Sequence, residues 1–361
     1  MQEYLNQRDT ANAAKGVAII LMFIHHFFTF PAWYIEGIAY PHLEGFADFF
    51  CLPTKICVSI FAFLTGYFYI TFSKQSYRHS FKKIIDIMIS YWMVFLPMLL
   101  LALSWGVYQF ELSGVLLEAF ALKRSIMVFC WYIPFYVCLM LLLPVVTKLL
   151  TKSMFLDVVI LSVVQGVLVV LAHKIQVPYL TETLESVSLW FMFVMAGCLV
   201  AKYKLYDRVF DKILMGTPPK FTRLPIAAVM VVTPFLLQNK ELTSRLMGMG
   251  EGVLDVQRMQ LLKALMLPFF LYGLLQILFA MKNTVIFNLL VQLGKMSMSM
   301  WFIHCMFFNV CKYQLQPILY CLRNPLLVLT FGCAVCYLLA RLLEPVRAAL
   351  VGKVNHLLRF D

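Results

Sequence analysis

Two ionisable residues share one face of an apolar segment near the start of the chain. Lys15 and His26 stand eleven positions apart in a stretch that otherwise reads as a membrane-spanning helix. Eleven residues turn an α-helix by about 1,100°, within about 20° of three full turns, and advance it by about 16.5 Å. Lys15 is therefore expected near one membrane surface, where its cation suits anionic phosphates. His26 is expected deeper, where a histidine suits general base catalysis.

Each of these residues also has a purely structural interpretation. His26 could form an interhelical hydrogen bond, and Lys15 could extend its side chain to the lipid headgroups. His25 is rotated by about 80° from Lys15 on a helix, so it is the weaker partner. Ionisable groups inside a membrane are costly to keep, however, and a functional role is the default hypothesis for such residues.

Polar or small residues recur at helical spacing in two further apolar segments: Lys55, Ser59, Ala62 and Gly66 in one, and Gly294, Ser297, Trp301 and His304 in the other. Such a stripe lines a polar cavity or lets a neighbouring helix pack closely. Trp131 is typical of an interfacial aromatic belt. The sequence has no Walker A, G-x-S-x-G, H-E-x-x-H or acidic metal-binding motif. These residues alone indicate a membrane enzyme or a transporter.

The composition determines the class of protein. Of 361 residues, 62% are hydrophobic and 13% are charged, whereas soluble domains carry about 25% charged residues. We expect an all-α integral membrane protein formed by one domain, residues 1–361, with a transmembrane core at about 12–345 and a short basic tail at 346–361. Ten spans are expected, near 12–31, 53–72, 84–104, 126–147, 154–173, 186–202, 223–239, 259–281, 285–311 and 325–345. Residues 105–125 are expected to hold a re-entrant or interfacial piece.

The charges of the loops predict the orientation. The net charge is +12, and the loops on the side of the N-terminus hold roughly twice as many Lys and Arg residues as the opposite loops. Both termini are therefore expected in the cytoplasm. The basic residues are explained by topology and lipid headgroups, so nucleic acid is not an expected partner.

Four segments of this chain resemble acyltransferase family 3, the bacterial multi-pass membrane enzymes that acylate surface glycans. Lys15 to His26 is similar to the family's Arg/Lys-x10-His signature, and residues 60–67 (IFAFLTGY) look like its F-x-F-L-S-G-Y segment, with Thr65 in place of serine. Residues 130–136 (CWYIPFY) resemble its W-Y-L/I segment, and residues 293–304 (LGKMSMSMWFIH) its L-G-x-x-S-x-x-x-W/Y-x-x-H helix. The segments occur in the family's order, in a chain that lacks the extra soluble domain of some relatives.

The resemblance implies an activity. An acyl group, commonly acetyl, would pass from cytoplasmic acyl-CoA to a hydroxyl of an exopolysaccharide, another surface polysaccharide or its lipid-linked precursor. The location would be the bacterial cytoplasmic membrane, with polysaccharide-biosynthesis proteins as potential partners. Acyl-CoA would be a substrate, and no permanently bound cofactor or metal is expected.

The same resemblance assigns roles to residues. His26, Lys15 and His25 are the predicted catalytic residues, with His26 as the base or as an acyl relay. Lys15 would contact CoA phosphate, helped by Arg78 or Lys83, and Glu36 or Asp48 would orient His26. The predicted substrate-binding residues are Lys55, Ser59, Arg78, Trp131, Ser297, Trp301 and His304.

A polysaccharide export protein without transferase activity is the alternative. Transporters are often built from two related halves with broken helices in matching positions, and the sequence shows no such pairing. A purely structural role would leave the intramembrane Lys and His residues unexplained. Binding or hydrolysis of acyl-CoA distinguishes the enzyme from both alternatives.

Overall fold

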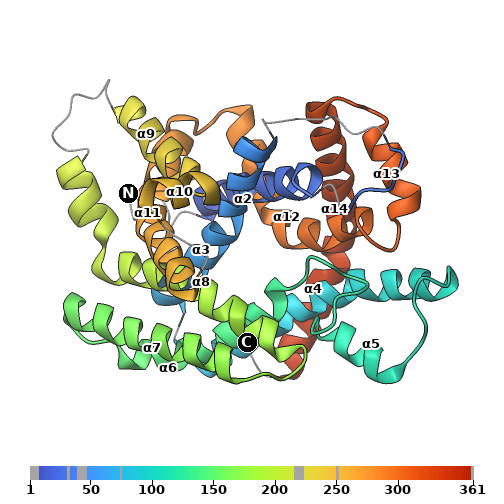
Figure 1. The fold of residues 1–361 in the computed structure, drawn as a ribbon, viewed down its shortest axis with the longest axis horizontal. Helices are drawn as coiled ribbons and strands as arrows, with labels where there is room; N and C mark the ends of the chain where they lie inside the picture. Colours follow the sequence, from blue (N-terminus) through green and yellow to red (C-terminus); the bar gives the residue numbers. More distant parts are fainter. Residues whose placement is uncertain are drawn as a thin grey trace.

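A computed structural model describes residues 8–30, 33–38, 47–73, 75–214, 223–248 and 252–358, and within these ranges it contains helices and no strand. Nine of the described helical segments are long and apolar enough to cross a membrane. They contain α2 (Arg8–Phe28), α3 (Ile56–Phe72), α4 (Tyr77–Ser104), α6 (Tyr132–Leu149), α7 (Met154–Lys174), α8 (Leu180–Tyr203), α11 (Val253–Ala280), α12 (Val285–His304) and α14 (Pro325–Leu357). The all-α multi-pass membrane bundle expected from the sequence is confirmed (Figure 1).

Shorter helices fill the connections between these segments: η2 (Ala47–Cys51), η3 (Leu52–Lys55), α5 (Leu112–Ala119), η4 (Tyr206–Leu214), α10 (Lys240–Met247), η6 (Cys305–Phe307) and α13 (Lys312–Tyr320). Helix α5 occupies the region where a re-entrant or interfacial piece was expected. The span predicted at 223–239 forms α9 (Arg223–Leu236), whose 14 residues give a length of about 21 Å, short of the roughly 30 Å hydrocarbon core.

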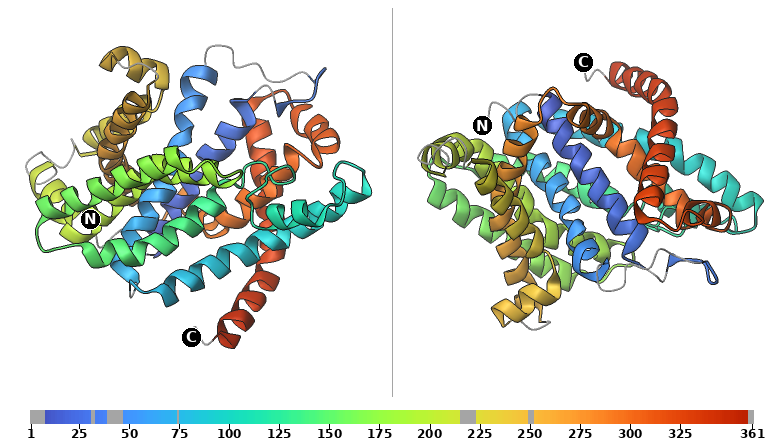
Figure 2. Two further views of the ribbon diagram at one scale, coloured as in Figure 1. Left: turned by 60° about the horizontal axis from the view of Figure 1, so that its bottom comes forward. Right: turned by 90° about the horizontal axis from the view of Figure 1, so that it is seen from above.

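The last helix is longer than predicted. The expected span ended near 345, but α14 continues through Pro345 to Leu357, and its C-terminal part projects beyond the bundle in both views of Figure 2. Just after Pro345, Arg347 forms ion pairs with Glu344 at 2.7 Å and with Asp86 of α4 at 2.6 Å. These contacts hold the helix where a basic tail was expected to begin.

Polar side chains define where several helices begin. Ser76, Ser153 and Thr284 each accept a hydrogen bond from the backbone N–H three residues later, at the starts of α4, α7 and α12. The Asn324 side chain accepts hydrogen bonds from the backbone N–H groups of Leu326 and Leu327 at the start of α14. Each bond satisfies a donor that the helix cannot pair internally.

Glycines set the closest approach in the centre of the bundle, where α2 and α12 lie side by side (Figures 1 and 2). A Cβ atom at Gly16 would collide with the carbonyl oxygen of Leu290, and one at Gly294 with that of Asn12. A second pair joins α3 to α8, where Gly66 faces Val194 and Gly197 faces Phe63. Gly66 therefore serves close helix packing, one of the two interpretations of its stripe.

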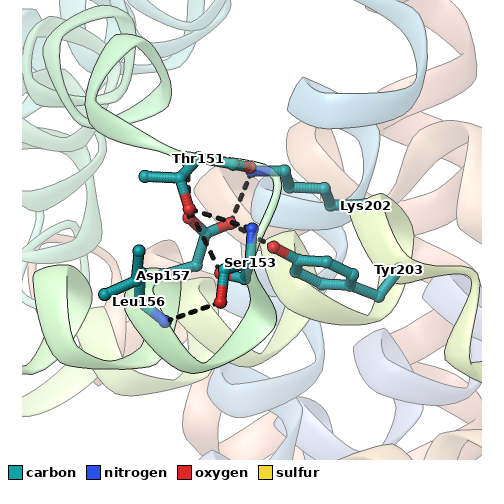
Figure 3. A network of polar contacts seen from close by, with 6 residues as sticks. All are labelled: Thr151, Ser153, Leu156, Asp157, Lys202 and Tyr203. Atoms are coloured by element: carbon teal, nitrogen blue, oxygen red, sulfur yellow. Dashed lines mark hydrogen bonds and ion pairs between the residues drawn. The ribbon is translucent and has the colours of Figure 1, made fainter.

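A buried ion pair ties α7 to α8 (Figure 3). The Asp157 carboxylate has no exposed side-chain surface and lies 2.5 Å from the Lys202 ammonium. It also accepts hydrogen bonds from the Tyr203 hydroxyl at 2.7 Å and from the backbone and hydroxyl of Thr151. Because the carboxylate is paired and hydrogen-bonded, its burial is compensated.

Candidate active site

A cavity of about 880 Å³ opens between six helices. Its walls come from α2, α3, α4, α6, α12 and α14. The side chains that carry its polar character are Arg8, Asn12, Lys15, Thr65, Tyr69, His79, Lys83, Asp86, Tyr132, Tyr136, Lys295, Ser297, Trp301, Glu344 and Arg347. A polar cavity of this size inside an apolar bundle is the expected form of a small-molecule site.

One part of the cavity is a cluster of unneutralised cations, which we call the basic mouth: Arg8, Lys15, Lys83 and Lys295. None of the four has an ion pair with a carboxylate within the described ranges. The Lys15 ammonium lies 5.7 Å from the centre of the Phe68 ring, a cation–π contact that leaves its N–H donors available. The fifth cation, Arg347, is engaged by Asp86 and Glu344. The basic mouth is thus suited to an anionic ligand.

The remainder of the cavity is lined by hydroxyl groups and rings. Tyr132 and Trp301 contact each other at right angles, with ring centres 5.2 Å apart. The Tyr132 side chain is buried, and its hydroxyl has no hydrogen-bond partner among the described residues. The Thr65 hydroxyl lies beside it and donates to the Phe61 carbonyl at 2.8 Å, so its oxygen can still accept a proton from Tyr132. The Tyr132 hydroxyl can therefore donate to Thr65 or to a ligand in the cavity.

Two histidines meet beyond this wall. His26, near the end of α2, and His304, the last residue of α12, are 2.7 Å apart between Nδ1 and Nε2, with nearly parallel rings. His304 is fully buried and His26 is 9% exposed. Neither borders the cavity. His304 is nevertheless joined to it through Trp301, whose carbonyl oxygen contacts Nδ1 of His304 and whose side chain forms part of the cavity wall.

The hydrogen bonds fix which nitrogen carries each proton. The Trp301 carbonyl can only accept, so Nδ1 of His304 is the donor and, in the neutral ring, Nε2 of His304 is an acceptor. The Nδ1–H of His26 must then donate to that nitrogen. Nε2 of His26 is left with a lone pair. A histidine whose proton is held on one nitrogen by a buried neighbour is arranged as a general base.

A loop from outside the motif segments covers this pair. Phe129 stacks on the His26 ring with centres 4.0 Å apart. The loop that carries it is anchored by the buried Glu118 carboxylate, which accepts hydrogen bonds from Ser125 and from the backbone N–H of Ile126. The Tyr91 hydroxyl fixes the same turn by donating to the Glu118 carbonyl at 2.7 Å. The ring of Phe129 therefore shields one face of His26 from water.

The comparison with known protein families identifies the family of this chain. A family model described as an acyltransferase domain, acyltransferase family 3, matches residues 9–344. The chain belongs to this acyltransferase family. No match was found among curated proteins or among solved structures. The resemblance carried by the four sequence segments is confirmed, and the protein is a membrane acyltransferase.

The acyltransferase gathers only some of the residues predicted for its site. Lys15, Ser297 and Trp301 line the cavity, as does Lys83, and His304 contacts His26. Arg78 is exposed and lies outside the lining. Trp131 packs behind Tyr132, with ring centres 5.9 Å apart.

Other predicted residues of the acyltransferase face elsewhere. Nδ1 of His25 lies 3.3 Å from the carbonyl oxygen of Cys51, away from the pair formed by His26. Lys55 lies over the Trp190 ring and Ser59 is fully buried, and neither lines the cavity. Glu36 is exposed, and the side chain of Asp48 lies outside the described part of the chain. Among the described side chains, His304 is the hydrogen-bond partner of Nδ1 of His26, and the role of Asp48 stays a prediction.

Sequence reasoning missed several residues of the acyltransferase site. Arg8 precedes Lys15 by seven residues, close to two helical turns, so an earlier helix start would have placed it on the same face. Phe129 has no such signal, because only the fold of the loop brings it to His26. The roles of Asp86 and Glu344 likewise depend on a contact between α4 and α14.

Proposed function

We propose that this membrane acyltransferase moves an acyl group, most simply acetyl, from cytoplasmic acyl-CoA to a hydroxyl group of a surface polysaccharide, an exopolysaccharide or its lipid-linked precursor. One observation carries the proposal: a cavity with an unneutralised basic mouth ends at a wall directly behind which two histidines are hydrogen-bonded. The family resemblance supports the glycan acceptor and a location in the bacterial cytoplasmic membrane.

The basic mouth suits the phosphates of CoA. Lysine and arginine are the usual partners of phosphate groups, and charge-assisted hydrogen bonds are the stronger kind. Lys15 and His26 are eleven residues apart on one face of α2, which corresponds to about 16.5 Å along the axis. A donor whose phosphates contact Lys15 would extend its acyl end along the cavity toward Tyr132 and Trp301.

The chemistry then follows from the hydrogen-bond order of the pair. Nε2 of His26 takes the proton of the acceptor hydroxyl as its oxygen attacks the thioester carbonyl. The tetrahedral intermediate collapses with cleavage of the carbon–sulfur bond, and the leaving CoA thiolate takes that proton from the imidazolium. His304 holds the His26 ring and its tautomer through the transfer. The unpaired Tyr132 hydroxyl is available to donate to the carbonyl oxygen as its negative charge develops.

Acyl transfer in membranes tests this function. Radiolabelled acetyl-CoA is added to membranes that contain wild type or His26→Gln at matched expression, and label in glycan is measured. Removing a general base lowers the rate by about 10²- to 10⁴-fold, so His26→Gln should incorporate almost no label. Phe28→Leu, two residues along the same helix, is the matched control and should retain full transfer. Full transfer by His26→Gln would overturn the assignment.

A further inference from the structure

A second polar region lies on the other side of an aromatic row that borders the cavity. The row runs from Trp301 through Tyr132 and Trp131 to Trp190, with successive ring centres 5.2, 5.9 and 6.0 Å apart. Trp301 and Tyr132 face the cavity. At the far end, Trp190 carries the ammonium of Lys55 at 5.9 Å from its ring centre. The mechanism described above makes no use of Lys55.

Lys55 has a cationic neighbour. Lys263 of α11 is 91% buried, and Lys55 lies within electrostatic range of it. Within the described residues neither lysine has an ion pair with a carboxylate. Lys263 donates one hydrogen bond, to the Gln238 carbonyl at 3.1 Å. An ammonium group has three donors, so the pair retains unused donors and positive charge.

Buried polar atoms without partners lie one helical turn from each lysine. The Ser59 hydroxyl follows Lys55 by four residues, and the Gln260 side-chain carbonyl precedes Lys263 by three. Both oxygens are buried and have no hydrogen-bond partner among the described residues. Lys55 is exposed, so its ammonium is open to solvent or to a ligand, whereas Lys263 is buried. The orphaned oxygens and the buried charge of Lys263 are costly in an apolar bundle unless a polar ligand satisfies them. We call Lys55, Lys263, Ser59, Gln260 and Trp190 the outer lysine site.

The outer lysine site is close to the reacting groups. Helix η3, which ends at Lys55, packs against α2, which carries His25 and His26. The basic mouth belongs to the cavity that Trp301 and Tyr132 line at one end of the aromatic row, and Lys55 lies over Trp190 at the other end. If the donor enters through the basic mouth, the outer lysine site is the place for a charged part of the other substrate.

We propose that the outer lysine site binds an anionic group of the acceptor, a carboxylate or a phosphate on or next to the sugar that receives the acyl group. This inference rests on the proposed function and names the acceptor class. The buried Trp190 ring offers an apolar base beneath the anion, and the Ser59 and Gln260 oxygens would accept hydrogen bonds from sugar hydroxyls. A neutral sugar would leave the charge of the buried Lys263 uncompensated.

Binding of small sugars of known charge tests the inference. Purified protein is titrated with glucuronate, glucose 6-phosphate or glucose, and tryptophan fluorescence reports binding because Lys55 lies over Trp190. The anionic sugars should bind at least about tenfold more tightly than glucose, since a hydrogen bond to a charged group contributes that much or more. Binding of glucuronate alone would indicate an acidic sugar as acceptor, and binding of glucose 6-phosphate alone a phosphorylated or lipid-linked one.

Three variants test whether the preference for anionic sugars arises at the outer lysine site. The double variant Lys55→Gln/Lys263→Gln should lose the preference for anionic sugars, and Trp190→Phe should lose the signal. Lys148→Gln, an exposed residue away from both sites, controls for net charge. Equal binding of glucose and the anionic sugars, no binding of any of them, or unchanged binding by the double variant would overturn the inference.

Binding of acetyl-CoA, measured in the same preparations, separates this inference from the proposed function. It should weaken in Lys15→Gln and remain unchanged in the double variant. Wild type that ignores acetyl-CoA would contradict the function, whereas the sugar titrations judge the outer lysine site independently.

Discussion

At the scale of single residues, the proposed chemistry depends on the position of one proton. His304 is bound on one nitrogen by a backbone carbonyl and on the other by His26, so the tautomer of His26 depends on a neighbour 278 residues away in sequence. In the proposed mechanism His304 is a positioning residue, because it acts through His26. Its importance lies in geometry and proton placement, and it is not assigned a contact with either substrate.

His304→Gln should separate positioning from binding. The glutamine removes the ring that fixes the His26 tautomer, so kcat should fall by about 10²-fold or more while the KM for acyl-CoA stays within a factor of about two. Steady-state kinetics on purified protein, with the pH profile of kcat, checks this. A change confined to the KM for acyl-CoA would show that His304 contributes to donor binding instead.

Lys15→Gln should have the opposite pattern. Loss of one charge-assisted contact with phosphate should raise the KM for acyl-CoA by about ten- to a hundredfold with little change in kcat. Lys148→Gln, also a cation-to-amide change, should leave both constants unchanged. A lower kcat at unchanged KM in Lys15→Gln would place Lys15 outside the donor site.

The sequence could predict part of this site and not the rest. Helical spacing placed Lys15 and His26 on one face because both lie on the same helix. No such periodicity links His26 to His304 or to Phe129, since those contacts join segments far apart in the chain. Lys55 and Ser59 were expected in the substrate cavity, but their helical stripe does not specify which neighbouring helix it faces.

At the scale of helices, glycine contacts hold the site together, and an ion pair joins α7 to α8 outside it. Close approach of α2 and α12 brings Lys15, His26, Ser297 and His304 to one region of the bundle. The apolar segments were predictable because each must span the membrane. The ends of the helices were harder to predict from the sequence. Helix α14 continues past Pro345 because Arg347 forms ion pairs with carboxylates on α4 and on its own helix.

Gly294→Ala should destabilise the protein. The added methyl group would collide with the Asn12 carbonyl, and overpacking of this kind costs about 1–3 kcal/mol. Gly166→Ala is the matched control, since no atom lies within 4 Å of its Cβ position. Thermal unfolding in detergent, followed by a thiol-reactive dye that detects the buried cysteines, should show a lower midpoint for Gly294→Ala alone. Equal midpoints would argue against close packing at this position.

Asp157→Asn tests the ion pair between α7 and α8 (Figure 3). It leaves the partly exposed Lys202 ammonium without its carboxylate, and losing a hydrogen bond to a charged group costs about 1.5–3 kcal/mol. The double variant Asp157→Asn/Lys202→Met removes both charges and should regain most of the lost stability in the same unfolding assay. A double variant no more stable than Asp157→Asn would show that the charge of Lys202 is not the cause.

At the scale of the whole molecule, the proposed function places the donor in the cavity and the acceptor near the histidine pair. The basic mouth is formed by the first halves of α2 and α4 and the middle of α12, and the histidines lie at the ends of α2 and α12. With the orientation predicted from the loop charges, the mouth faces the cytoplasm and the histidines lie toward the opposite surface. In the proposed function, the cavity would hold the donor from the basic mouth as far as the wall formed by Tyr132 and Trp301.

Sidedness of the donor tests this account most directly. Sealed vesicles of either orientation are prepared, with an impermeant maleimide on the exposed Cys321 reporting orientation and Cys321→Ser as its control. Radiolabelled acetyl-CoA added outside should label glycan only in vesicles whose Cys321 is protected, and right-side-out vesicles should gain label only after permeabilisation. Transfer from acetyl-CoA supplied on the Cys321 side of intact vesicles would contradict a donor route through the basic mouth.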